Sequence, residues 1–220
     1  SHGKTTTTSL VASIFQNTKL DPTIINGGVI NSIKNTAKLG KSEWSILEAD
    51  ESDGSFIHIS PAYSIITNID REHMDYYRSM RDIKSYFRQF INKVPSFGKS
   101  FICVDDKINN ELIREIKNKN FYTYGTKLNA NYHISNIQQN KIYSSFDLKI
   151  NLPNKRRMTI KDFKIPLLGI HNIRNSVAAI AVSLTVGISI PNIKKGLINF
   201  KGVQRRFNKI FTYNNIDFYD

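Results

Sequence analysis

The chain has 220 residues, of which 40% are hydrophobic, which is enough to build a sizeable core and excludes a disordered chain. No apolar run is as long as the roughly 20 residues of a membrane-spanning helix. The net charge of +13 favours anionic ligands such as nucleotides, phosphosugars or nucleic acid. Its lysines are spread along the chain rather than gathered in one stripe, so the charge identifies no partner. The single Cys103 cannot form an internal disulfide, which fits a reducing compartment, and it reads as a buried strand residue.

The first half of the chain alternates between predicted helices and strands. A Gly-Lys-Thr triplet at residues 3–5 leads into a helix whose apolar residues recur at helical spacing over 10–15. Strands are predicted at 22–28, 43–50, 62–70 and 99–106, and amphipathic helices at 79–94 and 107–118. This alternation favours an α/β fold with a mostly parallel, doubly wound sheet.

The pattern changes after residue 120. Segments 121–125, 131–153 and 156–167 have the alternation of strands with no helix between them, which predicts a small antiparallel sheet, inserted in or appended to the α/β core, at about 121–166. Helices return at 171–188 and 190–200, and residues 207–220 are typical of a hairpin around Asn214 and Asn215.

The start of the chain carries the residue types that bind phosphate. Backbone N–H groups at a helix N-terminus face the anion, a lysine reaches its oxygens and a threonine hydroxyl ligates Mg²⁺. Gly3, Lys4 and Thr5 are the candidates for these roles. The full pattern needs another glycine five residues earlier, after a strand, and neither is present. The match is therefore either accidental or evidence that the chain is a fragment.

Three polar segments follow predicted strand ends or their equivalents, at residues 3–6, 48–53 and 68–75, and on a common sheet they would face one crevice. The sequence EADESD at 48–53 has four carboxylates in six residues, which repel one another unless a cation lies among them. We therefore favour a magnesium site over a solvated acidic turn. Glu48, the first residue after the apolar run, is the best-placed ligand, and solvent is expected to screen Glu51 further along the turn.

Three other features keep two interpretations each. Mg²⁺ prefers oxygen ligands, so residue chemistry alone favours a surface or helix-capping role for His73. Asn172 and Asn175 are three residues apart on one helix face and could read an adenine edge, or Asn172 could simply cap the helix. Arg205 and Arg206 could clamp a phosphate or form a solvated basic turn.

Taken together, these segments resemble the Mur ligase family of peptidoglycan synthesis. The segments SHGKTTTTS, EADESDGSF, TNIDREHMDYY, GIHNIRNSVAAIAV and FKGVQRRF look like the family's blocks, in the same order and over nearly the whole chain. The Gly-Ser-Phe after EADESD favours the branch that adds L-alanine to UDP-N-acetylmuramate.

The resemblance implies ATP and Mg²⁺ as cofactors and assigns roles to residues. Lys4, Glu48 and His73 become the expected catalytic residues, and Thr5, Glu48 and His73 the expected magnesium ligands. The expected ATP-binding residues are His2, Gly3, Lys4, Thr5, Thr6, Asn172, Asn175 and Arg206.

The implied reaction is an ATP-driven amide synthesis in the bacterial cytoplasm. The muramate carboxylate attacks the γ-phosphate to form an acyl phosphate, and the amine of L-alanine then displaces phosphate. The chain matches only the family's central ATPase domain, over 1–220, so we expect it to be truncated at both ends, without the UDP-binding and amino-acid-binding domains.

The expected partners are these small substrates, not nucleic acid or a membrane. The alternatives are a tripeptide-recycling or folate-type ligase of the same family. A basic nucleic-acid-binding P-loop ATPase, whose binding would weaken steeply with salt, is a further alternative.

Overall fold

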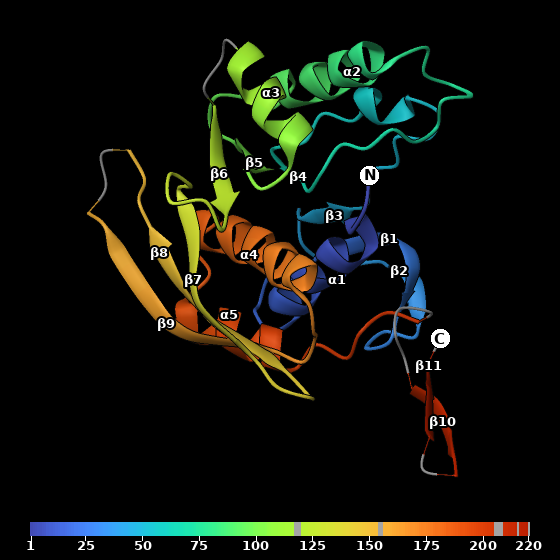
Figure 1. Cartoon of the computed structure of the whole chain (residues 1–220), viewed down its shortest axis with the longest axis vertical. Coiled ribbons are helices and arrows are strands. Elements are labelled where there is room, and N and C mark those ends of the chain that lie inside the picture. The colour runs from blue at the N-terminus through green and yellow to red at the C-terminus, as the bar shows by residue number, and fades with distance from the viewer. Residues whose placement is uncertain (117–119, 154–155, 205–208, 215, 220) are drawn as a thin grey trace.

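Two β-sheets and a hairpin are found in the part of the chain that the computed structural model describes, residues 1–116, 120–153, 156–204, 209–214 and 216–219 (Figure 1). The larger sheet has the strand order β4-β5-β6-β7-β8-β9. Its first four strands are parallel neighbours, and β7, β8 and β9 pair antiparallel. The bounds of these strands are β4 Tyr63–Ile66, β5 Lys99–Cys103, β6 Phe121–Gly125, β7 Tyr132–Gln139, β8 Ser144–Ile150 and β9 Met158–Ile165.

The smaller sheet has the order β2-β1-β3. Its strand β3 ends directly before the second polar segment, at residues 48–53. Strand β1 (Thr23–Ile30) pairs parallel with β3 (Ser45–Leu47) and antiparallel with β2 (Asn35–Lys38). Strands β10 (Lys209–Tyr213) and β11 (Ile216–Tyr219) form the hairpin, which extends away from both sheets (Figure 1).

Helices cover both faces of the parallel strands (Figure 1). Strand β5 shows why, because alternate side chains of a strand point to opposite faces. Phe101 and Cys103 belong to one apolar core with side chains of α1 and α4, whereas Ile102 belongs to a second core with side chains of α2 and α3. The helix bounds are α1 Lys4–Gln16, α2 Met80–Asn92, α3 Lys107–Glu115, α4 Ile170–Thr185 and α5 Ile190–Ile198, with the 3-10 turn η1 at Ser55–His58.

The local sequence explains where helices α2 and α3 begin. The Ser79 hydroxyl accepts the backbone N–H of Asp82 and caps α2, and the Asp106 carboxylate accepts the N–H of Asn109 and caps α3. Helix α2 then buries one apolar stripe against the sheet, formed by Ile83, Phe87, Phe90 and Ile91.

The predicted α/β class with a parallel, doubly wound sheet is confirmed, and two details differ. Residues 121–125 form a parallel neighbour of β5, so the antiparallel strands start only at β7, and from there they are appended to the main sheet. The pairing of β1 with β2 was not predicted, because β2 is short and largely exposed. No helix in the described residues has both the length and the apolar character needed to cross a membrane.

Candidate functional site

The start of α1 has the backbone geometry of an anion-binding turn. Gly3 precedes the helix with φ 83°, and no side chain caps the first N–H groups of α1. A Cβ at Gly3 would lie 2.7 Å from Oδ1 of Asn175 in α4, so both the conformation and the space require glycine. The first N–H groups of a helix without a cap are available to an anion.

Lys4 lies against the acidic turn that follows β3. Its Nζ donates to Oδ1 of Asp50 at 3.0 Å and also to Oε2 of Glu51. Partial burial acts to lower the pKa of Lys4, but its hydrogen bonds to the two carboxylates outweigh this and raise it. Lys4 is therefore a positive charge at the start of α1 that two carboxylates hold, and its role at a phosphate stays a prediction.

Glu51 was expected to be screened by solvent, and this expectation is wrong. Only 5% of the residue is exposed, because the turn folds back under Lys4 and the hydroxyl of Tyr77 donates to the Glu51 carbonyl. Burial acts to raise the pKa of the Glu51 carboxyl, but the hydrogen bond from Lys4 and its positive charge act to lower it, and the pKa lies below its ordinary value. Its Oε1 accepts no hydrogen bond from the described residues.

Glu48 faces the phosphate loop from the end of β3. Its Oε1 accepts the Thr5 hydroxyl at 2.9 Å, and its Oε2 accepts the backbone N–H of Gly27 at 2.6 Å. Both contacts follow from the parallel pairing of β1 with β3, which brings the ends of these strands to the start of α1. The structure thus brings together the predicted pair of Thr5 and Glu48.

The third predicted segment, after β4, joins the same place through His2. The amide oxygen of Asn68 accepts the His2 N–H at 2.7 Å, and the hydroxyl of Thr67 donates to the His2 carbonyl at 2.8 Å. The His2 ring lies 3.1 Å from Oδ2 of Asp70. The three polar segments therefore converge, as predicted, although β3 and β4 belong to different sheets.

His73 is not grouped with Glu48. One ligand atom from each of Glu51, Glu72 and His73 lies within 4.8 Å of the others, and this is the arrangement that could hold a metal ion among the described residues. His73 has φ 55°, which is uncommon for a residue other than glycine, and its carbonyl accepts the N–H groups of Tyr76 and Tyr77. Sequence reasoning missed Glu51 and Glu72 as neighbours of His73.

Of the two predicted asparagines in α4, only Asn175 approaches the phosphate loop. Its side chain lies against Gly3, as described above, and 6% of the residue is exposed. The Asn172 amide instead donates to the Leu168 carbonyl at 2.8 Å, which is consistent with a role at the helix start. Arg206, like Arg205, lies outside the described residues.

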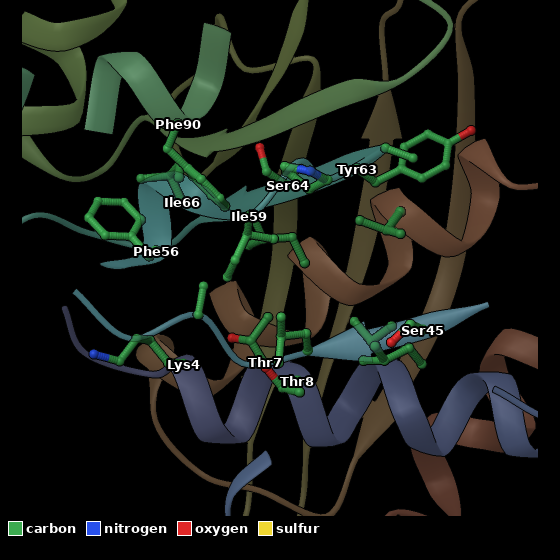
Figure 2. A pocket seen from close by; sticks show the side chains of 18 of the residues that line it. Lys4, Thr7, Thr8, Ser45, Phe56, Ile59, Tyr63, Ser64, Ile66 and Phe90 are labelled. Carbon is green, nitrogen blue, oxygen red and sulfur yellow. The ribbon is translucent and has the colours of Figure 1, made fainter. Parts of the chain in front are cut away.

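A cavity of about 720 Å³ extends from this site between β3 and β4. Figure 2 shows Phe56, Ile59 and Phe90 on one side of it and Thr7 and Thr8 of α1 on the other, with Lys4 toward one end. The walls are mainly apolar. The polar groups of the site therefore gather at one end of a cavity that separates the two sheets.

Comparisons with known proteins identify the family of the chain. The description "Mur ligase middle domain" belongs to the family model that matches residues 1–183. A UDP-N-acetylmuramate–L-alanine ligase from Pelagibacter ubique is 70% identical over all 220 residues, and one from Rickettsia rickettsii is 49% identical over 222 aligned positions. The chain covers 47% and 46% of these two relatives, so it spans about half of their length.

Solved structures give the same fold. A UDP-N-acetylmuramate-alanine ligase from Thermotoga maritima matches the whole chain and 47% of its own length with a TM-score of 0.81 and 26% identity. A ligase from Neisseria meningitides, named for UDP-N-acetylmuramate and a tripeptide, matches 93% of the chain and 65% of its own length, with a TM-score of 0.77 and 24% identity. The family model and these relatives show that the chain belongs to the Mur ligase middle-domain family.

Proposed function

We propose that this chain is the ATP-binding part of a ligase that joins L-alanine to UDP-N-acetylmuramate in peptidoglycan biosynthesis, in the bacterial cytoplasm. The observation that carries the proposal is the meeting of the uncapped start of α1 with Lys4 and with the carboxylates of the turn at 48–51. The substrates come from the name of the relative that is 70% identical over the whole chain. Binding of the UDP-sugar and of the amino acid would then belong to other domains of a longer protein.

The residues present fit a magnesium nucleotide. The first N–H groups of α1 would bind phosphate oxygens, and Lys4 would leave Asp50 and Glu51 to contact the same anion. Thr5 and Glu48, which already share a hydrogen bond, would hold the metal, and His73, which lies with Glu51 and Glu72 instead, is proposed as a ligand from the sequence alone. Bound Mg²⁺ supplies positive charge to the oxygens of the phosphoryl group that is transferred.

The remaining roles concern the base and the acyl transfer. Asn175, which lies against Gly3, and Asn172, whose amide donates to the Leu168 carbonyl, are proposed for the adenine from the sequence alone, as Arg206 is for the phosphates. Lys4 would stabilise negative charge on the γ-phosphate while the muramate carboxylate attacks it, giving an acyl phosphate. The amine of L-alanine would then attack the acyl carbon and release phosphate.

The test uses the longer protein that contains this chain. Phosphate release that requires both UDP-N-acetylmuramate and L-alanine is measured while Mg²⁺ is titrated. We expect Glu48→Gln to raise the Mg²⁺ requirement and to lower turnover by about 10²-fold, the scale of losing one group that stabilises transition-state charge. Asp53→Asn is the control, because Asp53 lies in the same acidic turn but is exposed and caps only Ser55.

Three outcomes would overturn the proposal. Turnover with a muramyl tripeptide or a folate acceptor, and none with L-alanine, would favour one of the related ligases. Turnover stimulated by nucleic acid would favour the basic ATPase. Equal losses in Glu48→Gln and Asp53→Asn would show that the turn acts only as a diffuse negative charge.

A further inference from the structure

A second buried carboxylate lies at the end of β5, outside the residues discussed so far. The side chain of Asp105 is 5% exposed. It accepts the backbone N–H of Thr126 at 2.9 and 3.0 Å, the Thr126 hydroxyl at 3.0 Å and the N–H of Lys127 at 3.3 Å. Gly125, with φ 147°, makes room for it, since a Cβ there would lie 2.6 Å from the Asp105 Oδ1. Asp105 therefore joins the end of β5 to the loop after β6.

The same carboxylate holds the first turns of α4. Nε of Arg174 donates to Oδ2 of Asp105 at 2.6 Å, and among the described residues Arg174 is the only cation within 4.0 Å of it. A short charge-assisted hydrogen bond of this kind fixes direction as well as distance. Arg174 thus ties α4 to the carboxyl ends of β5 and β6.

Arg174 is adjacent to Asn175, which lies against Gly3 of the phosphate loop. The contacts therefore run without a break from Asp105 through Arg174 and the backbone of α4 to the Asn175 amide and the start of α1. The Asn175 side chain is so close to Gly3 that a Cβ at Gly3 would lie 2.7 Å from Asn175 Oδ1. A shift of the start of α4 by even 1 Å would therefore change the space beside Gly3.

We propose that Asp105 and Arg174 are positioning residues for the nucleotide: by fixing the start of α4, they hold Asn175 beside the phosphate loop and so set the affinity for a nucleoside triphosphate. This rests on the proposed function only in taking a magnesium nucleotide as the ligand. Asp105 is not expected to contact the nucleotide itself, because its carboxylate is enclosed by its partners, and Arg174 is proposed to act through its hydrogen bond to that carboxylate.

The test measures the dissociation constant of Mg-ATP for the full 220-residue chain by calorimetry, well below the melting temperature. We expect Asp105→Asn and Arg174→Gln each to weaken binding at least five-fold. The double variant should be no weaker than the weaker single variant, because both changes break one contact. Arg174→Lys, which keeps the charge, should recover part of the affinity.

Asp106→Asn is the matched control. Asp106 is the next residue in the chain and caps α3 through the N–H of Asn109, and among the described residues its side chain makes no hydrogen bond or ion pair with α4. We expect it to lower thermal stability while the dissociation constant stays within two-fold of that of the unmodified chain. Melting temperatures of all the variants are measured alongside, so that a loss of fold is separated from a loss of affinity.

Two results would overturn the inference. If the unmodified chain binds Mg-ATP and the Asp105 and Arg174 variants bind it equally well, the pair only stabilises the fold and the proposed function stands. If the unmodified chain does not bind Mg-ATP, the proposed function fails and this inference fails with it.

Discussion

Two strand ends in this protein each hold a basic side chain against a buried carboxylate, and they differ in what else satisfies that carboxylate. After β3, Glu51 pairs with Lys4, and after β5, Asp105 pairs with Arg174. Both Asp105 oxygens also accept hydrogen bonds from the loop after β6, whereas Oε1 of Glu51 accepts none from the described residues. The Asp105 pair is therefore a closed structural contact, and the Glu51 pair is open to a change of partner.

The largest effect should come from removing the cation of the open pair. Lys4→Ala in the longer protein is expected to lower ATP turnover by about 10²–10³-fold, because the charge that would stabilise the transferred phosphoryl group is lost. The measurement is phosphate release at saturating Mg-ATP, with Lys41→Ala, an exposed lysine outside this site, as the control. Turnover within a few-fold of the unmodified protein would mean that Lys4 only balances the charge of Glu51.

Removing the carboxylate of the open pair should affect stability and binding in opposite directions. We expect Glu51→Gln to lower the free energy of unfolding by about 1–3 kcal/mol, the scale of a hydrogen bond between charged groups of which the carboxylate is buried. Binding of inorganic triphosphate, followed by calorimetry, should tighten by a few-fold because Lys4 would then be held by the Asp50 carboxylate alone. Asp105→Asn should not tighten it. If Glu51→Gln weakens triphosphate binding instead, then Glu51 contributes directly to the site.

This comparison also shows how far the sequence could predict the site. The alternation of strands and helices was sufficient to predict that the three polar segments meet, but not that β3 and β4 lead into them from two different sheets. The position of Glu48 could be predicted, because Glu48 is the first residue after an apolar run. The burial of Glu51 could not be predicted, because it depends on the path of a turn that is closed by Tyr77, a residue 26 positions away in the chain.

Other contacts depend on pairings that a single sequence does not display. In the sequence, Asp105 and Asp106 are typical of an ordinary polar turn. The partners of Asp105 come from two segments that are at least 21 positions away in the chain. The grouping of His73 with Glu51 and Glu72 is accompanied by a left-handed backbone at His73, which the residue type allows but does not predict. No local sequence pattern indicates that β3 and β4 belong to different sheets.

A smaller effect concerns pH. The pKa of Glu51 is lowered in the folded chain, so its contribution to stability is present above the unfolded pKa of about 4.3 and is lost as the pH falls through the folded value. Unfolding free energies of the unmodified chain and of Glu51→Gln should therefore differ at pH 7 and converge below about pH 4. Urea titrations at both pH values measure this. A difference that persists unchanged at pH 3 would show that shape, not charge, stabilises the turn.

The smallest effect uses Cys103 as a reporter for the closed pair. Cys103 ends β5, two residues before Asp105, and it is 3% exposed. Burial raises the pKa of its thiol to about 11. At pH 8 the thiol is therefore inaccessible and mostly protonated, so disulfide reagents should modify it slowly. The side-chain amide of Asn109 donates to the Cys103 carbonyl at 3.0 Å and keeps this end of the strand in place.

Because the Asp105 contacts join that same strand end to the loop after β6, Asp105→Asn should let it open locally and speed the labelling of Cys103 by several-fold. Glu51→Gln should leave the labelling rate unchanged, since Glu51 contacts a different turn, even though it lowers the stability of the whole chain. Labelling is followed at pH 8 and well below the melting temperature, with the urea-unfolded chain as the reference for a fully accessible thiol. Equal acceleration in both variants would mean that labelling follows global unfolding, and the distinction between an open and a closed ion pair would then have no local basis at β5. Acceleration in Asp105→Asn alone would place the difference in the contacts of that one carboxylate.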